Sequence, residues 1–248
     1  MLASWALLSD RKPPEDSLEI VRERETARPL SDDEMRVYLI RHGQSEYNKW
    51  RRESFTKLRW RDMITYDPEI YDAPLTERAR DQIRNLSQVL NASLEAGRLE
   101  IDAIYSSPLS RSIDTAAMAF EGSDKPLLLH PLLREKCETT GDIGLPRSEL
   151  QRRHPHWDFT HFHEHDEEWW HKGDPSAPLA FFRKIPHEPS TLLHERTERW
   201  ANFLSGRSEK SICVVGHSMF FKRWTRSSKM RNLEVRAFIF NKATRILS

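Results

Sequence analysis

The sequence predicts an α/β protein, arranged as a three-layer α/β/α sandwich with a mostly parallel sheet and one inserted lid. Short apolar segments typical of buried strands alternate with longer segments of helical periodicity along most of the chain. Several apolar segments end abruptly in charged or polar residues, as parallel strands do where they meet a ligand. The length of 248 residues suits one domain of this kind with an insertion.

The first strand is predicted over 37–40, which is apolar and rich in β-prone residues. A helix is predicted from Thr76, a good N-cap, to Gly97 as its C-cap. Apolar residues recur along this helix at a spacing that places them on one face; they are Ala79, Ile83, Leu86, Leu90 and Leu94. The second strand is predicted over 101–107, where Pro108 ends it.

The remaining elements continue the alternation of helix and strand. A second helix is predicted over 109–120 and a short third strand over 127–130. A helix over about 191–204 precedes the strongest late strand, 211–216, which leads into His217 and another helix. The alternating segment 235–240 is predicted to be an edge strand.

Two segments fall outside this rhythm. Residues 1–34 are charged and contain prolines, so we expect a poorly ordered leader ahead of a domain that spans 35–248. Residues of about 137–189 are rich in His, Trp, Phe, Pro and acidic side chains, which predicts an inserted lid. Specificity for the substrate is expected to lie in 49–74 and in this lid.

The bulk composition argues against several classes of partner. A formal net charge of +1 gives no case for nucleic acid or for an acidic membrane. The apolar start of the chain is too short to span a bilayer and lacks the basic residues of a secretory signal. Two cysteines cannot form a disulfide framework. We therefore expect a cytoplasmic protein.

The most informative segment is the end of the first strand, where Arg41, His42 and Gly43 follow the apolar residues directly. Arginine offers a fixed fork of donors that matches two phosphate oxygens. A neutral imidazole can attack phosphorus near neutral pH, and Gly43 would let the backbone turn tightly close to the ligand. The alternative is a buried histidine at a strand end, without chemistry.

Reactive side chains follow the other strands as well. Arg111 opens the helix after the second strand, Glu135 lies a few residues past the third, and His217 follows the late one. Parallel strands end at one edge of the sheet, so residues far apart in sequence can converge on one pocket there. This convergence supports a functional site more strongly than any single motif does.

An ordered set of motifs resembles the histidine phosphatase superfamily, also called phosphoglycerate-mutase-like. The matching segments are 39–48 with Arg-His-Gly, Leu75-Thr76, 106–116 with Arg111, Leu133-Arg134-Glu135 and 214–218 with Gly216-His217. Together they span roughly residues 36–241, and each segment alone is an ordinary one.

The resemblance implies a histidine acid-type phosphatase, a phosphomonoester hydrolase that needs neither metal nor cofactor. His42 would be the nucleophile that becomes a phosphohistidine, and Glu135 would be the general acid. Arg41, Arg111 and His217 would surround the phosphate oxygens. Further hydrogen bonds to the substrate are expected from Ser45, Asn48 and Ser218. The partner is expected to be a small phosphorylated substrate, and the oligomeric state stays open.

Departures from the family pattern leave alternatives. Glu135 is followed by residues 136–139, Lys-Cys-Glu-Thr, where the phosphoglycerate mutases usually continue Arg-His-Tyr-Gly. This difference favours a phosphatase over a mutase, and a phospho-ligand-binding protein with weak catalysis is a further alternative. Glu138 and Glu149 are other candidates for the acid. Many family members have Gly where this chain has Ala79, which a helix tolerates well.

Three further patterns allow two interpretations each. His161, His163 and His165 alternate and could hold zinc on a strand, or simply belong to a polar lid. The lid aromatics could line the substrate entrance or form a small core of the lid; they are Trp157, Phe159, Phe162, Trp169 and Trp170. The basic, aromatic segment 50–61 could bind a second anionic group or be a solvated loop.

Overall fold

A central sheet of six strands, in the order β3-β2-β4-β1-β5-β6, organises the computed structural model. The model describes residues 29–56, 67–163, 167–173, 185 and 187–248, so the predicted leader lies outside the described residues except for its last six. The strands are β1 (Glu34–Arg41), β2 (Ala103–Ser106), β3 (Leu127–Leu129), β4 (Ser211–Gly216), β5 (Val235–Asn241) and β6 (Ile246–Leu247).

Four neighbouring strands, β3, β2, β4 and β1, run parallel. The last two strands reverse direction, since β5 is antiparallel to β1 and β6 is antiparallel to β5. The mostly parallel sheet is therefore confirmed. The segment 235–240 forms a strand, β5, as predicted. Its predicted position at the edge of the sheet is wrong, because β6 pairs with the outer side of β5 and is the edge strand.

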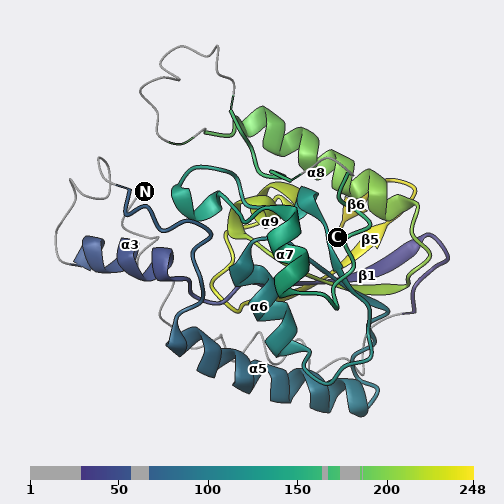
Figure 1. The fold of residues 1–248 in the computed structure, drawn as a ribbon. Helices are drawn as coiled ribbons and strands as arrows, with labels where there is room; N and C mark the ends of the chain where they lie inside the picture. The colour runs from purple at the N-terminus through teal and green to yellow at the C-terminus, as the bar shows by residue number, and fades with distance from the viewer. Residues whose placement is uncertain (1–28, 57–66, 164–166, 174–184, 186) are drawn as a thin grey trace.

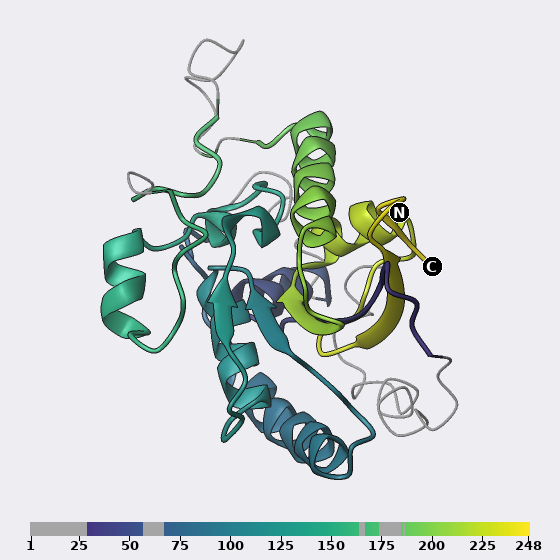
Figure 2. The ribbon, with the colours of Figure 1, turned by 90° about the vertical axis from the view of Figure 1, so that its right-hand side faces the viewer.

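Helices cover both faces of the sheet and give the predicted three layers (Figures 1 and 2). α5 (Glu77–Glu95) and α6 (Ser110–Ala119) lie on one face, and α8 (Ser190–Ser205) and α9 (Ser218–Thr225) lie on the other. Successive side chains of a strand point to opposite faces of the sheet, so each strand packs against both layers of helices. In β1, Tyr38 and Ile40 pack with α5 and α6, whereas Val37 and Leu39 pack with α8 and α9.

The boundaries of α5 follow the sequence signals closely. The side chain of Thr76 accepts a hydrogen bond from the Ala79 amide at 3.1 Å and caps the helix as predicted. The helix ends at Glu95 with Ala96 as C-cap, and Gly97 follows with a positive φ of 66°. The predicted end is therefore one residue late, and glycine serves the left-handed residue after the cap.

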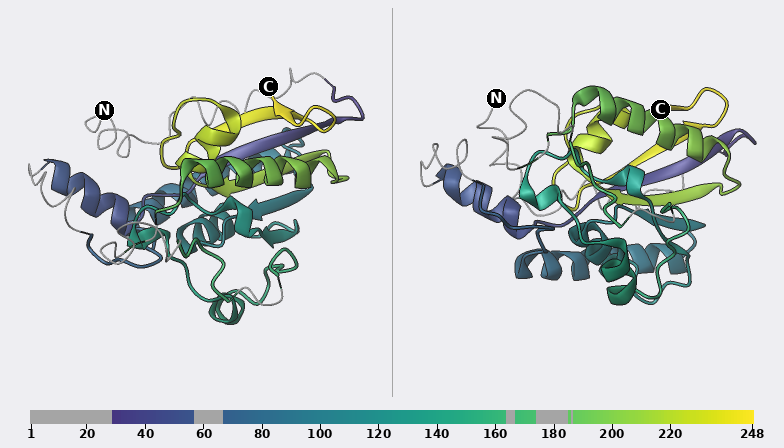
Figure 3. Two further views of the ribbon diagram at one scale, coloured as in Figure 1. Left: turned by 90° about the horizontal axis from the view of Figure 1, so that it is seen from above. Right: turned by 45° about the horizontal axis from the view of Figure 1, so that its top comes forward.

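Two helices were not predicted. α3 (Glu46–Thr56) takes up part of the segment expected to be a loop, and α7 (Arg147–Arg153) lies within the lid. α3 is capped reciprocally, because Asn48 N donates to Ser45 Oγ at 3.2 Å and Ser45 N donates to Asn48 Oδ1 at 3.4 Å. The view from above separates α3 from the helices that cover the sheet (Figure 3).

The aromatic residues of the lid pack into the core beside α5 and α6. Trp157, Phe159, Phe162 and Trp169 are each at most 8% exposed and belong to the same apolar cluster as the α5 stripe, and Trp170 packs against it. Asp158 also bridges to Leu128 of β3. The described aromatics therefore form a core, and the interpretation that they line a substrate entrance is wrong.

Gly43 is required by helix packing. A Cβ atom at this position would lie 3.1 Å from Ala79 Cβ, 3.1 Å from a Leu75 methyl and 3.2 Å from an Ile83 methyl. The expectation that glycine serves a tight turn next to a ligand is thus corrected: no positive φ is required at Gly43, and its missing side chain lets α5 approach β1.

We expect Gly43→Ala to lower the free energy of unfolding by about 1–3 kcal/mol, because a well-packed core resists an added methyl group. Ala79→Gly alone should cost about 1 kcal/mol through helix propensity. The double variant should recover part of the Gly43→Ala loss, since removal of the Ala79 methyl relieves one close contact. Urea denaturation of all four proteins measures the coupling, and strictly additive losses would contradict the packing explanation.

Candidate active site

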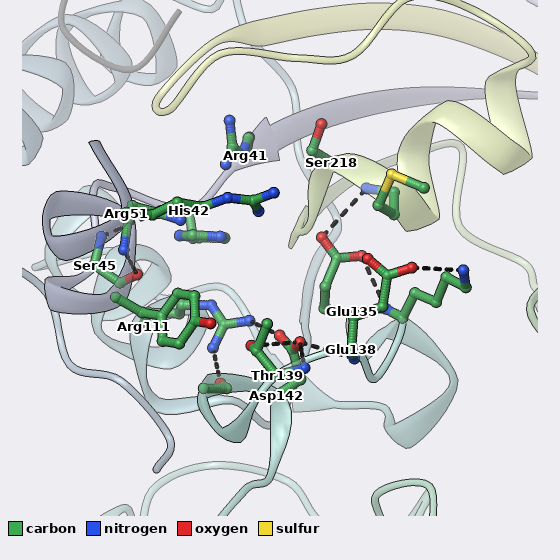
Figure 4. Close-up of a pocket in the computed structure, with 15 residues that line it drawn as sticks. Arg41, His42, Ser45, Arg51, Arg111, Glu135, Glu138, Thr139, Asp142 and Ser218 are labelled. Carbon is green, nitrogen blue, oxygen red and sulfur yellow. Dashed lines mark hydrogen bonds and ion pairs between the residues drawn. The ribbon is translucent and has the colours of Figure 1, made fainter. Parts of the chain in front are cut away.

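The β1–β4 register brings together the two histidines that follow these strands at the edge of the sheet. Arg41 pairs with Gly216 as the last residue of each strand, and His42 N donates to Gly216 O at 3.0 Å. The rings of His42 and His217, which follow directly, have centroids 4.9 Å apart. The predicted convergence of strand ends is therefore present, and a pocket opens beside the His42 ring (Figure 4).

His42 is buried and held in one orientation. Its Nδ1 lies 2.6 Å from Gly43 O, and because a carbonyl only accepts, Nδ1 carries the proton. Nε2 is then the nitrogen with a free lone pair. Asn232 Nδ2 also donates to His42 O at 2.8 Å. Burial, together with the Arg111 and Arg41 charges, holds the pKa of His42 well below its ordinary value, so the ring is neutral.

His217 lies behind this ring and is fully buried. Its Nε2 is 2.8 Å from Ser107 Oγ, and that hydroxyl already accepts a hydrogen bond from Leu109 N at 3.3 Å. The Ser107 proton can therefore point to Nε2, which leaves the proton of His217 on Nδ1. Nδ1 is buried and has no hydrogen-bond partner among the described residues. Nδ1 is thus a donor without an acceptor in the described part of the chain, although His217 is not among the residues that line the pocket.

Arg41 presents a guanidinium that is only partly used by the protein. One of its terminal nitrogens donates to Met230 O at 2.9 Å, while Nε is buried without a partner in the described part of the chain. Burial lowers the pKa of Arg41 to about 10, partly offset by Glu135. The group therefore stays charged at neutral pH and keeps donors for an anion.

Arg111 approaches the pocket from the start of α6. It donates to Gly141 O at 2.5 Å and to Asp142 Oδ1 at 3.0 Å, both from the short 3-10 turn Thr140–Asp142. Asp142 accepts through Oδ2 from Thr139 Oγ1 at 2.9 Å and is itself buried. The turn therefore fixes the plane of the guanidinium, which orients its remaining donors.

Glu135 lies across the pocket from Arg111 (Figure 4). Its carboxylate accepts from Lys136 N at 2.9 Å and from Met219 N, in the first turn of α9, at 3.3 Å. Burial raises the pKa of Glu135, and the charge of Asp142 raises it further. A raised pKa lets a carboxyl group carry a proton under conditions where an ordinary glutamate is ionised.

The other two acid candidates differ from Glu135 in their surroundings. Glu138 lines the pocket, but its carboxylate is 42% exposed and forms an ion pair with Lys136 at 2.6 Å. Glu149 lies on α7, outside the residues that line the pocket, and is paired with Arg152 and Arg153. Of the three glutamates that the sequence offered as the acid, Glu135 and Glu138 line the pocket and Glu149 does not.

The three predicted substrate-binding residues also line this pocket, and each has a structural partner. Ser45 and Asn48 cap α3, as described above, and point the N-terminal end of that helix at the pocket. Ser218 Oγ donates to Met230 O at 3.4 Å. The N-terminus is the positive end of a helix dipole, so α3 adds favourable electrostatics to the arginines.

Several residues of the site were missed by sequence reasoning. Asp142 and Tyr47 line the pocket, and a Cβ atom on Gly141 would lie 3.3 Å from the Tyr47 ring. Thr115 accepts from Gly43 N at 3.0 Å, and Asn232 holds the His42 carbonyl. Tyr47 and Thr115 stand within the family motifs and could have been found there, whereas Asp142 and Asn232 depend on tertiary contacts that no local pattern reveals.

The zinc interpretation of the lid histidines finds no support in the described residues, where no three His, Cys, Asp or Glu side chains gather to hold a metal. His161 stacks on His130 with ring centroids 4.9 Å apart, while His163 is exposed. His165 lies outside the described residues. Of the basic segment 50–61, Arg51 lines the pocket, and the part from 57 onward is also outside them.

Fold and site define a class of protein: an α/β sandwich with a buried pair of histidines at the carboxyl edge of parallel strands, beside a pocket that His42, Arg41 and Arg111 line. The chain belongs to the histidine phosphatase superfamily, since the family model for its branch 1 matches residues 37–235. In the described part of the chain, no helix is both long and apolar enough to cross a membrane.

Individual relatives agree with this assignment. A probable phosphatase of Schizosaccharomyces pombe is 25% identical over 201 residues, which cover 78% of each chain. A probable phosphoglycerate mutase of Cronobacter sakazakii is 31% identical over 120 residues, or 48% of this chain and 42% of that protein. A solved structure of an alpha-ribazole phosphatase from Shigella flexneri has a TM-score of 0.52 at 18% identity, covers 86% of this chain and 94% of its own, and shares the fold.

We expect Asp142→Ala to lower the free energy of unfolding by about 3–5 kcal/mol, because it leaves the buried Arg111 guanidinium without its counter-charge. The matched control is Asp81→Ala, which removes an exposed ion pair with Arg84 and should leave the urea midpoint almost unchanged. Equal losses in both variants would show that the Asp142 pair has no special role.

Proposed function

We propose that this protein is a metal-independent phosphomonoester hydrolase, a histidine acid-type phosphatase that acts through a phosphohistidine at His42. The observation that carries the proposal is the state of the His42 ring. It is buried, neutral and hydrogen-bonded through Nδ1 to Gly43 O, so that Nε2 is the free nucleophile beside two guanidinium groups. This arrangement favours attack on a phosphorus atom whose oxygens the arginines bind.

In the first step, His42 Nε2 attacks phosphorus and the bond from phosphorus to the ester oxygen breaks. Arg41, Arg111 and His217 Nδ1 donate to the non-bridging oxygens, where charge is concentrated in the transition state. Glu135 transfers its proton to the departing oxygen, which leaves as an alcohol. The proton stays on Nδ1, hydrogen-bonded to Gly43 O, and this bond stabilises the positive charge that develops on the imidazole.

In the second step, water attacks the phosphohistidine. Glu135, now a carboxylate, takes a proton from this water, and the bond from Nε2 to phosphorus breaks. Inorganic phosphate leaves, His42 recovers its neutral ring, and Glu135 recovers its proton. Arg41 and Arg111 supply the positive charge that balances the transferred phosphoryl group.

Glu135 suits the acid role better than Asp142 or Glu138. Burial also raises the pKa of Asp142, but this carboxylate accepts hydrogen bonds on both oxygens, from Arg111, from Thr139 and from two backbone amides, and these bonds favour its ionised form. Glu138 is half-exposed and paired with Lys136. Glu135 accepts only two backbone amides and has the desolvated setting in which a carboxyl group keeps its proton.

The substrate class that we propose is a small phosphorylated molecule, bound without nucleic acid or membrane. The match to a probable mutase keeps phosphoglycerate isomerisation as the second candidate. The Lys-Cys-Glu-Thr segment at 136–139 favours hydrolysis, since it lacks the residues with which mutases hold their phosphoglycerates. Two free, buried cysteines are compatible with the reducing cytoplasm.

We expect His42→Ala to abolish turnover of 4-nitrophenyl phosphate, because His42 is the one histidine of the described residues that lines the pocket. Wild-type protein quenched during turnover of a ³²P-labelled ester should carry acid-labile, base-stable label on His42. The matched control is His130→Ala, which removes a buried histidine away from the pocket and should leave labelling intact.

Other outcomes would redirect the assignment. Brisk catalysis without label at His42 would contradict the covalent mechanism. Wild type and His42→Ala both inert toward a broad panel of phosphate esters would favour a phospho-ligand-binding protein. Conversion of 3-phosphoglycerate to its isomer in the presence of 2,3-bisphosphoglycerate, with little free phosphate, would favour the mutase.

The pH dependence of kcat/KM should follow Glu135. The acid must be protonated in the free enzyme, so kcat/KM should fall as pH rises through the Glu135 pKa, which burial raises. Loss of activity toward low pH should come late, because the His42 pKa is well below its ordinary value. Glu135→Gln should lower kcat/KM for phenyl phosphate about 10²–10⁴-fold and remove this alkaline limb. A limb that persists unchanged in the variant belongs to another group.

A further inference from the structure

A buried ion network lies directly behind the segment that carries Glu135. Glu188 has a fully buried carboxylate and receives a bidentate pair from Arg196 of α8, with Nε to Oε1 at 3.0 Å and an amino nitrogen to Oε2 at 2.8 Å. Arg134, the residue before Glu135, donates to Glu188 Oε1 at 3.0 Å. Two arginines thus share one carboxylate that has no contact with solvent.

The same network closes the base of the insertion. Cys137 N donates to Glu188 Oε2 at 3.2 Å, and Glu188 N donates to Cys137 O at 2.8 Å. These two reciprocal bonds fix the backbone two residues after Glu135 to Glu188, which stands two residues before the start of α8. The segment 134–137 is consequently fixed on both sides of the proposed acid.

Arg196 also contacts this segment through its remaining donors. It donates to Leu132 O at 2.8 Å, to Arg134 O at 2.6 Å and to Glu135 O at 3.4 Å. Its guanidinium lies 5.4 Å from the centre of the Phe220 ring. Phe220 follows Met219, whose amide holds the Glu135 carboxylate. One side chain therefore contacts both the backbone of Glu135 and the helix turn that binds its carboxylate.

We propose that Arg196 and Glu188 are positioning residues for the general acid, and that they set the distance between the Glu135 carboxyl group and the leaving oxygen. The inference rests on the function proposed above for Glu135. Neither residue lines the pocket, so both act only through the segment 134–137 and through α9.

A purely stabilising role explains this arrangement less well. A buried ion pair is costly to desolvate and is often replaced by apolar residues without loss of stability. Here the donors of Arg196 are spent on carbonyls of three residues that flank or include Glu135, which fixes geometry at one place. Misplacement of a catalytic group by about 1 Å costs on the order of 10²-fold in rate.

The test compares two esters of similar shape, phenyl phosphate and 4-nitrophenyl phosphate. Phenolate is a poor leaving group and needs the proton of Glu135, whereas 4-nitrophenolate leaves readily without it. The ratio of their kcat/KM values therefore reports proton donation during formation of the phosphoenzyme. General loss of folded protein lowers both values equally and does not change the ratio.

The variants are Arg196→Lys and Glu188→Gln, each of which keeps a polar partner in the network, with Glu135→Gln as the reference for a lost acid. The matched control is Arg207→Lys. Arg207 also pairs with a carboxylate, that of Glu209, and lies 5.6 Å from the Phe203 ring of α8. It stands just after the C-terminal end of α8, whereas Glu188 stands before the N-terminal end. Circular dichroism and melting curves define the folded fraction of every variant.

We expect Arg196→Lys and Glu188→Gln to lower kcat/KM for phenyl phosphate by about tenfold or more, with a loss of less than about threefold for 4-nitrophenyl phosphate. Combination of either change with Glu135→Gln should add little, because the acid is already absent. Arg207→Lys should leave the ratio at the wild-type value.

Equal losses for both esters, or additive losses in the Glu135→Gln background, would overturn the positioning role while the hydrolase assignment stands. A Glu135→Gln variant with no change in the ratio would remove the acid assignment itself, and the positioning role with it. Wild-type protein inert toward both esters would overturn the proposed function and this inference together.

Discussion

The parallel pairing of β1 with β4 is the constraint on which the rest of the site depends. Arg41 and Gly216 are register partners, and a histidine follows each of them. The register therefore places the two histidine rings 4.9 Å apart. A slip of one residue would turn the inward side chains of β1 to the wrong layer and separate the rings. The apolar alternation of Tyr38 and Ile40 against Val37 and Leu39 therefore protects the site as well as the core.

This register places polar and charged side chains in a buried environment, and each of them is stabilised there by its own partner or by its neutral form. Arg111 receives the Asp142 carboxylate, and Arg41 receives a backbone carbonyl. His42 needs no counter-charge, because its neutral form is favoured by burial and by both arginines. The cations thus remain charged while the proposed nucleophile remains uncharged, which is the electrostatic pattern that the proposed transfer of a phosphoryl group to nitrogen requires.

The sequence contained the sheet half of this site almost completely. Arg41, His42 and His217 follow apolar strands, and Arg111 follows a Pro-ended strand by three residues, so position along the chain was enough to place them. Gly43 and Ala79 were seen separately, but their contact depends on how α5 crosses β1. Asp142, Asn232 and the edge strand β6 could not be predicted, because each is defined by a partner distant in sequence rather than by its neighbours.

The acid half of the site has a different physical origin, and this explains why its residue was harder to assign. Glu135 stands six residues beyond the end of β3, where no strand register fixes the backbone. Its place depends on side chains from α8 and on the reciprocal bonds at the base of the insertion. The proposed nucleophile is fixed by the sheet and the proposed acid by the insertion, so the position of one can change without the other. The start of the insertion, with Glu138, Thr139 and Asp142, lines the pocket beside Glu135, so a change there can alter the fit of a substrate without moving the ends of the strands.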